Sequence, residues 1–559
     1  MKPGEIVEVT QAELDELLRL AKASFPAPQY DRLEQVLASF VSVMMSLQNA
    51  KISIKRLRQM VFGARTEHRR NVLAEIAADD DAHGPDAAAA ATVDAAAASA
   101  GVAAVEQVDD SAAKKPRKGH GRIGARAYEA ASVVTLDDLA LRPSDACPQC
   151  GSGRVYDSAP RTIVKVTGQP PLVATVYEQR RLRCRLCDAL YGATLPAGLA
   201  GPKYDHACAS MLAVLRYGCG MPFFRLEGLQ RALHMPLPDA TQWDIVSKAA
   251  AAPRAAYQAL IRQAAQAPLL HSDDTPMKVL SLMAERAKAE KNGLRPAAKA
   301  INTSGIVAVV QQPGEPAPQH RVVLFFTGHP HAGHNMARVL AERAAALPPP
   351  LQMCDALAAN VVGDLPVLVA NCLAHGRRQI VDVAEHFPEA ARRVIEDLAA
   401  VYDNDAKSRQ AALSPPQRLA FHQEHSKPIL DGLHRWMTQQ FEQRRVEPNS
   451  GLGKAMSYLL RHWSKLTRFL HAAGAPLDNN VCEQALKRAI LHRKASMFYK
   501  TLNGAEIGDI FMSLIHTCGL CSVNPFEYLK ALLRNAQEVC RDAQRWLPWN
   551  YLQRLADAA

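Results

Sequence analysis

The 559-residue chain lacks several features that would assign it to common classes of protein. It has no run of 18 apolar residues, which a membrane-spanning helix needs, and no basic-then-apolar signal at its amino terminus. We therefore expect a soluble, cytoplasmic protein. It also has no persuasive catalytic triad and no glycine-rich loop that would cradle phosphates, so the sequence does not indicate nucleophilic catalysis or P-loop chemistry.

Positive charge is missing from one long stretch. Residues 79–113 carry eight acidic residues and no Lys or Arg, and they are rich in Ala with few large apolar side chains. Such a segment cannot bury enough surface to offset the entropy of ordering, so we predict a flexible linker over residues 79–126. The whole chain has a formal charge of +11, so the residues outside the acidic stretch carry +19. A field this basic favours polyanions such as nucleic acid or an anionic membrane surface.

The predicted linker ends in a basic tract, KKPRKGHGRIGAR (residues 114–126), with six Lys or Arg and three Gly. This composition fits a segment that lies along phosphates or in a minor groove, and it fits a solubilising tail equally well. The candidate DNA contacts in the tract are Lys114, Lys115, Arg117 and Lys118.

An apolar heptad repeat runs over residues 33–61 with no Gly or Pro inside it. About four heptads predict a coiled coil, whose use would be self-association into a homo-oligomer. The alternative is an amphipathic helix packed on its own globule. Pro26 and Pro28 separate the repeat from a short helix predicted at 11–23, and together these elements make an amino-terminal segment over residues 1–78.

Four of the 12 cysteines form two Cys-x-x-Cys pairs, separated by 33 residues. Two such knuckles match a structural tetrahedral Zn²⁺ site, and the spacing suits a reducing compartment better than a disulfide scaffold. Residues 161–184 alternate apolar and polar side chains around a Gly-Gln-Pro-Pro turn, which predicts the hairpin of a zinc ribbon over residues 127–200. Four unrelated free cysteines are the alternative. The candidate zinc ligands are Cys147, Cys150, Cys184 and Cys187.

Residues 201–266 have a helical pattern. Two amphipathic segments around Met235-Pro-Leu-Pro238, with Asp239 or Thr241 as the N-cap of the second, suit a helix-turn-helix that reads a major groove. An ordinary helix pair is the alternative.

From residue 267 the pattern becomes α/β. Three strands in a row, then strands that alternate with a helix at 334–346, predict a mixed sheet flanked by helices over residues 267–378. Residues 379–475 read as helices only, and residues 476–559 as a further helix followed by carboxy-terminal helices. The predicted strands are 268–274, 305–312, 321–328, 351–356 and 365–372.

Three carboxylates stand at positions where such a fold could bring them together. Asp273 closes the first predicted strand, Asp355 closes the fourth, and Glu483 lies on a helix after the long helical stretch. Three carboxylates can hold two divalent ions that act on a phosphodiester, and Mg²⁺ needs few of them. Purely structural roles are the alternatives. Each Asp would begin a turn at the end of its strand, and Glu483 would form a capping box with Asn480.

Two other cysteine motifs are ambiguous. Cys372-x-x-His375 is half a metal site, but it also fits a core Cys beside a His that faces DNA together with Arg377 and Arg378. Cys518-Gly-Leu-Cys521 mimics a redox motif, but it lies on an apolar helix without the strand-helix context, which favours core cysteines.

Taken in order, the motifs resemble a DDE transposase of the insertion sequence sixty-six family. The matching pieces span about residues 33–533. They are the coiled coil with LRQMVFGARTEHRR, the basic tract, the two cysteine knuckles, HSDDTP, LQMCDA, NCLAHGRRQ, LDNNVCEQALKRAILHRK and NPFEYL. The chain departs from the family's usual residues at Asp274, Leu357, Leu373, Ser496 and Met497, which puts flanking contacts and end-sequence specificity in doubt more than chemistry.

The resemblance implies a multidomain α/β protein with a ribonuclease-H-like mixed sheet and a helical insertion. It implies that Asp273, Asp355 and Glu483 bind two Mg²⁺ or Mn²⁺ ions and that Asn480 caps the helix of Glu483. The implied partners are terminal inverted repeats, target DNA and small helper proteins of the same element, in a bacterial, nucleoid-associated setting. The implied DNA contacts are Lys487, Arg488, Arg493, Lys494, Arg377 and Arg378.

Two other functions stay open at this point. One is an inactive, transposase-derived protein kept for DNA binding or regulation. The other is a ribonuclease-H-like nuclease without strand transfer. An intact set of three carboxylates favours an active transposase over the first, and a dimerising coil favours it over the second.

Overall fold

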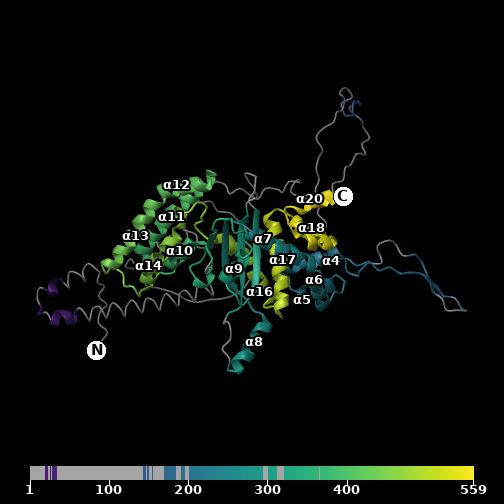
Figure 1. Ribbon diagram of the computed structural model, residues 1–559, viewed down its shortest axis with the longest axis horizontal. Coiled ribbons are helices and arrows are strands. Elements are labelled where there is room, and N and C mark those ends of the chain that lie inside the picture. The colour runs from purple at the N-terminus through teal and green to yellow at the C-terminus, as the bar shows by residue number, and fades with distance from the viewer. Residues whose placement is uncertain are drawn as a thin grey trace, which may run out of the picture. The chain divides into compact units, whose positions relative to one another are not determined.

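The computed structural model describes most of the chain from residue 201 onward (Figure 1). The chain divides into two compact units, residues 85–171 and the remainder. Several predicted features lie outside the described residues. They are the acidic linker, the basic tract, the four paired cysteines and the predicted coiled coil except for its first residue. The described residues are 201–293, 300–310, 320–363 and 365–558, with short pieces at 19–22, 25–26, 28–33, 143–146, 148–149, 154, 169–183, 185 and 190–194. Within them, no helix combines the length and apolar character that would let it span a membrane.

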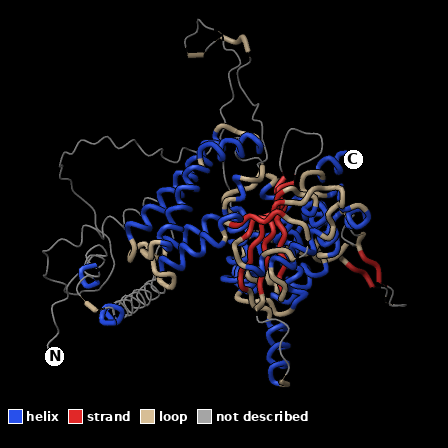
Figure 2. Tube along the Cα trace, turned by 60° about the vertical axis from the view of Figure 1, so that its left-hand side comes forward, coloured by secondary structure: helices blue, strands red, loops and turns tan. Residues whose placement is uncertain are grey.

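Five strands form one mixed sheet in the order β5-β4-β3-β6-β7, drawn in red in Figure 2. Strands β3, β4 and β5 are antiparallel neighbours, whereas β6 and β7 run parallel to β3. The prediction of five strands in a mixed sheet is confirmed. Their bounds are β3 (Leu269–Pro276), β4 (Asn302–Val310), β5 (His320–Gly328), β6 (Leu351–Cys354) and β7 (Leu368–Asn371).

Helices pack against the sheet. α7 (Ala251–Ala265) and α9 (Ala332–Leu340) contact one another and the antiparallel strands. α16 (Asn480–Ser496) lies across β3 and β4. In α7 the residues at every fourth position, Ala256, Leu260 and Ala264, are fully buried, because this spacing keeps them on one helix face.

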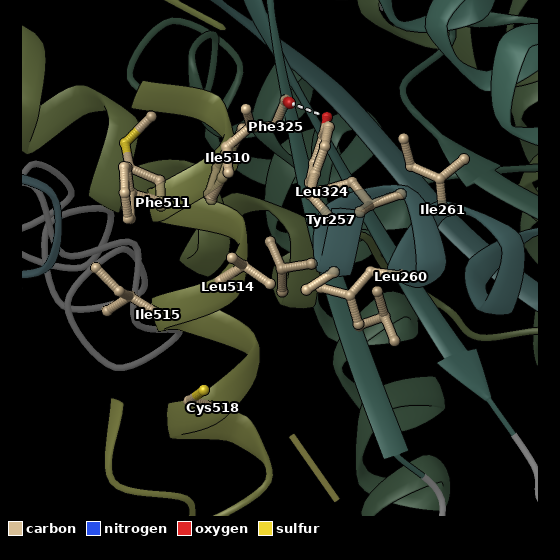
Figure 3. Close-up of a cluster of buried hydrophobic side chains, with 14 of the residues drawn as sticks. Tyr257, Leu260, Ile261, Leu324, Phe325, Ile510, Phe511, Leu514, Ile515 and Cys518 are labelled. Carbon is tan, nitrogen blue, oxygen red and sulfur yellow. Dashed lines mark hydrogen bonds between the residues drawn. The ribbon is translucent and has the colours of Figure 1, made fainter. Parts of the chain in front are cut away.

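The largest hydrophobic core joins β5 to α7 and α17 (Leu502–Leu520), as Figure 3 shows. Leu324 and Phe325 of β5 lie among Leu260 of α7 and Leu514 of α17, and none of the four is exposed. The Tyr257 hydroxyl in this core is satisfied, because it donates a 2.8 Å hydrogen bond to the Phe325 carbonyl. Burying one such leucine contributes roughly 2 kcal/mol.

The open edge of β5 is closed by a polar stripe on α17. Three buried side-chain oxygens at four-residue intervals accept hydrogen bonds from the backbone N–H groups of alternate β5 residues. The pairs are Asp509 with Thr327 at 2.6 Å, Ser513 with Phe325 at 2.9 Å and Thr517 with Val323 at 3.1 Å. Four helical residues rise ~6 Å and two strand residues ~6.8 Å, so the two ladders stay in step. The stripe thereby satisfies backbone N–H groups of β5 that would otherwise be free to pair with a strand of another chain.

Between β7 and α16 the chain forms only helices, as predicted, and these group to one side of the sheet in Figure 1. Pro415 does not break a helix but begins one, because proline fits the first helical turn, and Ser414 and Gln417 form a capping box there. A second core, which includes Leu398 and Leu433, holds these helices together. Their bounds are α10 (Leu373–Val381), α11 (Pro388–Gln410), α12 (Pro415–His425), α13 (Lys427–Glu442), α14 (Gly451–Arg461), α15 (Trp463–Leu466) and the 3₁₀ turn η4 (Arg468–Leu470).

The other helices precede the sheet or close the chain. A π-helical turn, η2 (Val214–Gly218), continues α4 and contacts α17. The 3₁₀ turns are η3 (Ala358–Asn360) and η5 (Ala543–Trp546). The remaining α-helices are α4 (His206–Ala213), α5 (Phe223–Ala232), α6 (Asp239–Lys248), α18 (Pro525–Arg534), α19 (Ala536–Arg541) and α20 (Tyr551–Ala558).

Three local predictions were wrong. Helix α8 (Leu280–Lys291) interrupts the three predicted consecutive strands and projects away from the sheet in both views. Its residues are good helix formers, but Leu282 is its one buried residue, so it has no clear apolar periodicity. The predicted pair of helices, α5 and α6, does form, but Pro238 occupies the N-cap of α6 and Asp239 is its first residue.

The third wrong prediction concerns the second arm of the zinc-ribbon hairpin. Residues 172–180 form no strand; instead β1 (Arg181–Arg183) pairs antiparallel with β2 (Leu190–Gly192), on either side of the second cysteine knuckle. Val173 and Val176, which would lie on opposite faces of a strand, are 78% and 85% exposed, so neither face has a surface to pack on. Alternation alone does not make a strand when neither face is buried.

Candidate active site

Asp273 and Asp274 lie in the middle of β3, not at its end as predicted. The strand continues because Thr275 and Pro276 still pair with β4. Successive side chains in a strand point to opposite faces, so the two carboxylates diverge. Asp274 has its partners at the start of α9, and Asp273 lies on the face shared with His271, which is the face that α16 covers.

Asp274 is held by three hydrogen bonds. One carboxylate oxygen accepts from the Ser304 hydroxyl at 2.6 Å, and the other accepts from the backbone N–H of Ala332 at 3.0 Å and lies 3.0 Å from His331 Nδ1. The N–H of Ala332 belongs to the first turn of α9, where a carboxylate is favoured. Asp274 therefore fastens α9 to the sheet and is not positioned for chemistry on the α16 side.

The start of α16 is fixed by Asn479, which is fully buried. Its amide nitrogen donates to the Ser272 carbonyl at 3.0 Å, and its amide oxygen lies 3.1 Å from His271 Nδ1. Because the amide is committed to β3, it makes no capping bond to its own helix. The prediction that Asn480 caps this helix was wrong: Asn480 is the first helical residue, and its N–H donates to Asp478 at 3.2 Å.

A close approach between α16 and β4 sets the height of the helix above the sheet. Gly305 pairs with Asp273 across β3 and β4. A Cβ atom on Gly305 would lie 2.9 Å from the Leu486 side chain, and the Cys482 thiol donates to the Gly305 carbonyl at 3.3 Å. Glycine at this position lets the first turn of α16, which carries Glu483, lie directly over β3 and β4.

Asp355 follows β6 and comes level with Asp273. The parallel register pairs His271 with Met353, so two residues further along each strand Asp273 and Asp355 are opposite one another. Neighbouring strands lie ~4.8 Å apart, which brings these two residues close. Asp355 Oδ1 accepts from the Asn360 amide at 2.7 Å and from the Leu357 N–H at 3.1 Å, so one oxygen is tied down and the other can face an ion.

The electrostatics link the three carboxylates. The pKa of Asp273 is raised to about 7, mainly because the side chain is buried. A hydrogen bond from the Asp274 N–H opposes the shift, and the negative charges of Asp355 and Glu483 add to it. Asp273 and Asp355 are 82 positions apart in the chain, and Asp355 and Glu483 are 128 apart, yet the charges of Asp355 and Glu483 affect the pKa of Asp273. This is expected for a site that gathers negative charge to hold a cation.

Glu483 also faces a histidine. His375 Nδ1, in the first turn of α10, lies 3.7 Å from Glu483 Oε1. Cys372, the N-cap of α10, is fully buried, and burial raises the pKa of its thiol to about 11. The core position predicted for Cys372 is confirmed, but His375 turns toward the Glu483 carboxylate.

The predicted DNA contacts on α16 fall into two groups. Lys487, Arg488 and Lys494 are exposed along the helix, although Arg488 also donates to the Gly218 carbonyl at 3.0 Å. Arg493 is half-buried and donates to the Thr275 hydroxyl at 3.1 Å and to the Pro276 carbonyl, so it fastens the end of β3. Arg377 and Arg378 are half-buried on α10, and the basic tract lies outside the described residues.

Sequence reasoning missed the residues that hold the carboxylates, chiefly Asn479, His271 and Asn360. Each is a buried polar side chain with a partner far away in the chain or in a turn. The available signal for Asn479 was its place before a helix, which also suits a cap. Nothing in the local sequence pointed to His271 or Asn360.

Known proteins resemble this chain over most of its length. The uncharacterized protein y4hP of Sinorhizobium fredii (strain NBRC 101917 / NGR234) is 24% identical over 446 residues, 75% of each chain. The uncharacterized protein y4jD of the same organism is 24% identical over 430 residues, 74% of this chain and 80% of that protein. No solved structure matches the chain.

A family match covers more than half of the chain and includes the whole of the site. Residues 203–507 match the family described as "Transposase IS66 family", and this range contains the sheet, the helical stretch and all three carboxylates. The resemblance drawn from the motifs is thereby confirmed, and the chain belongs to the IS66 family of transposases.

Proposed function

We propose that the protein is an active transposase that binds the ends of its element, cuts DNA strands there and joins the freed 3′-hydroxyl groups to target DNA. Membership of the family supports transposition. The observation that carries active chemistry is the register of β3 and β6, which sets Asp273 opposite Asp355 on the face of the sheet that α16 covers, with Glu483 in the first turn of that helix. An inactive descendant kept only to bind DNA would have no use for this costly cluster of like charges.

Asp273, Asp355 and Glu483 would hold two divalent ions, Mg²⁺ or Mn²⁺. Their oxygen donors suit these hard cations, and a cation would relieve the repulsion from Asp355 and Glu483, which adds to the effect of burial on the pKa of Asp273. In each Asp, Oδ1 accepts a backbone N–H, which orients the carboxylate. Ions bound there supply polarisation of the phosphodiester and activation of a water or a 3′-hydroxyl.

The chain's own residues supply binding and alignment. Lys487, Arg488 and Lys494 give α16 an exposed basic surface next to Glu483 that suits phosphates. Glu483 lies in the first turn of α16 and His375 in that of α10, and the positive end of a helix dipole favours an anion. A DNA strand bound along α16 would thus present a phosphate to the three carboxylates.

We also propose that the sheet is ribonuclease-H-like. The support is its topology, three antiparallel strands followed by two strands parallel to the first, with a carboxylate on the central strand β3 and another directly after the neighbouring β6. The helices between β7 and α16 would then be the insertion that precedes the last carboxylate. Outside the described residues, we propose one zinc at Cys147, Cys150, Cys184 and Cys187, and self-association through residues 33–61.

Replacing Glu483 by Gln tests the function. The variant keeps the shape of the side chain and the basic residues of α16, so it should bind terminal-repeat DNA with the salt dependence of the wild type. It should lose Mg²⁺- or Mn²⁺-dependent cleavage and joining by several orders of magnitude, as expected when a metal ligand is removed. Glu506→Gln, on an exposed Glu of α17 that pairs with Arg254, serves as the control and should retain activity.

The two alternatives predict other results. If wild-type protein binds the DNA but never cuts it under these conditions, the protein is a DNA-binding descendant. If it cuts but never joins a 3′-hydroxyl to target DNA, it is a nuclease. Full activity of Glu483→Gln would exclude Glu483 from the metal site.

A further inference from the structure

A second set of metal-binding atoms meets at Glu483. Cys372 is the N-cap of α10, His375 lies one turn further on, and Glu483 lies in the first turn of α16. One ligand atom from each lies within 4.8 Å of the other two. The sequence alone offered two ligands, Cys372 and His375, which are too few for a metal site. The fold brings Glu483 beside them as a third.

The backbone holds these three side chains together. The Leu373 N–H donates to the Leu477 carbonyl at 2.9 Å, and the Asn479 N–H donates to the Cys372 sulfur at 3.3 Å. These two bonds tie the start of α10 to the residues just before α16. These bonds therefore fix the spacing of the backbone segments that carry Cys372, His375 and Glu483.

The chemistry of this set differs from that of the three carboxylates. A thiol and an imidazole suit Zn²⁺ and related ions, whereas Mg²⁺ prefers oxygen alone. The separation of 3.7 Å between His375 Nδ1 and Glu483 Oε1 is close to the ~3.5 Å between two ligands of a tetrahedral zinc. Within the described part of the chain, His375 Nδ1 has no hydrogen-bond partner, which leaves it able to bind an ion.

We propose that Cys372, His375 and Glu483 form an inhibitory site for Zn²⁺ or a similar thiophilic ion, with water as the fourth ligand. Binding would release the thiol proton to solvent and draw the Glu483 carboxylate toward α10, away from Asp273 and Asp355. The inhibitory effect rests on the proposed catalytic role of Glu483, whereas the binding of the ion does not.

Binding is tested with Co²⁺, which shows a sulfur-to-metal absorption when a thiolate is a ligand. The full-length protein is loaded with zinc, dialysed against a chelator too weak to strip four thiolates, and titrated with Co²⁺. Wild type should bind about one equivalent of Co²⁺ with this absorption. The control Cys354→Ala, which alters another fully buried cysteine near the site, should bind Co²⁺ in the same way. Cys372→Ser, whose hydroxyl can still accept the Asn479 N–H, should lose the absorption, and Glu483→Gln should weaken binding on the order of tenfold or more.

The proposal is overturned if wild type shows no thiolate-bound Co²⁺ or if Cys372→Ser keeps the same absorption. Inhibition is then measured as the Zn²⁺ concentration that halves Mg²⁺-dependent DNA cleavage, relative to each variant's own zinc-free rate. This concentration should rise on the order of tenfold or more in Cys372→Ser. Equal inhibition of both proteins would contradict an inhibitory role. Absence of all cleavage with Co²⁺ binding intact would count against the proposed function alone.

Discussion

Asp273 and Asp274 are neighbours in the chain, but their carboxylates lie on opposite faces of β3. Asp274 is bound to the start of α9, whereas Asp273 lies on the α16 face, where burial raises its pKa and the charges of Asp355 and Glu483 add to that shift. The alternation of side chains along a strand thus gives two identical residues different tasks. One fastens a helix, and the other contributes to the candidate active site.

This difference predicts opposite outcomes for two substitutions. Asp274→Ala removes the partner of Ser304, His331 and the Ala332 N–H, so it should lower the free energy of unfolding by about 1–3 kcal/mol. Asp273→Asn removes a buried charge that is repelled by its neighbours, so it should leave stability equal or higher while abolishing DNA cleavage. Urea unfolding and a cleavage assay measure both. A stability loss in Asp273→Asn as large as that in Asp274→Ala would contradict this division of tasks.

Asn479 and Asn480 offer a second matched pair. Asn479 is fully buried and bonded to Ser272 and His271, whereas Asn480 is exposed. Asn479→Ala leaves the buried His271 without its partner and should cost about 1–3 kcal/mol of unfolding free energy, together with cleavage activity. Asn480→Ala should change stability by less than about 0.5 kcal/mol. Equal effects of the two would contradict the role of Asn479 in fixing the start of α16 to β3.

Gly305 predicts a coupling across the site. A methyl group there would press on Leu486, so Gly305→Ala should lower the free energy of unfolding by about 1–3 kcal/mol. It should also reduce DNA cleavage, because α16 would be lifted from the sheet. In a Leu486→Ala background the same change should cost at least ~1 kcal/mol less, because the space has been cleared. Gly432→Ala, on the helix α13 with open space around it, is the control and should stabilise by about 0.4–1 kcal/mol. If the losses in unfolding free energy of Gly305→Ala and Leu486→Ala simply add in the double variant, residue 305 and Leu486 are not in contact as described.

Asp509 predicts how stability depends on pH. Its pKa is raised to about 7 by burial, although hydrogen bonds from Thr327 oppose the shift. Between pH 4 and pH 7, approximately, folded Asp509 keeps a proton that the unfolded chain has lost, so the contribution of Asp509 to stability should fall as pH rises through this window and level off above it. A shift of this size corresponds to a change on the order of 4 kcal/mol. Asp509→Asn should remove this contribution from the slope in unfolding measurements across the window, whereas Asp273, whose pKa burial also raises to about 7, keeps its own contribution.

Asp405 gives a contrast of opposite sign. Burial would raise the pKa of this carboxyl, but its hydrogen bond with His422 and the charges of Arg418 and Arg409 hold the pKa below its usual value. Its contribution to stability is therefore present above pH 4 or so and is lost as pH falls further. Asp405→Asn should leave the slope between about pH 4 and pH 7 unchanged. If Asp509→Asn also leaves that slope unchanged, Asp509 does not titrate as described.

The elements of the sheet could be predicted from the sequence because their side chains are apolar in short runs between turn residues. All five strands and the helical stretch after β7 were found in this way. Helix α8 was not, because it buries little and therefore carries no apolar pattern. The polar stripe of α17 was also overlooked: Asp509, Ser513 and Thr517 stand four residues apart in an apolar helix, a spacing that has meaning only once β5 is known to be an edge.

For the candidate site, motif resemblance named the three carboxylates, but it did not say how they are held. Asn480 looked like the cap of α16, and local rules could not tell that the buried amide of Asn479 would fix the helix through β3 instead. Contacts between residues about 200 positions apart decide this, such as the one between Asn479 and His271. The link from His375 to Glu483 was out of reach for the same reason.

The central claim is that Asp273, Asp355 and Glu483 hold the catalytic ions together, and iron-directed cleavage of the protein chain tests it most directly. Fe²⁺ that replaces Mg²⁺ generates radicals in the presence of ascorbate and peroxide, and these cut the backbone beside the ligands. The account predicts cuts near all three residues in one protein, suppressed together by excess Mg²⁺ and lost together in Asp273→Asn. Since the proposed zinc site also includes Glu483, the cuts near Asp273 and Asp355 decide the matter. If no cuts fall near Asp273 and Asp355, or if those cuts persist in Asp273→Asn, the three carboxylates do not form one metal site.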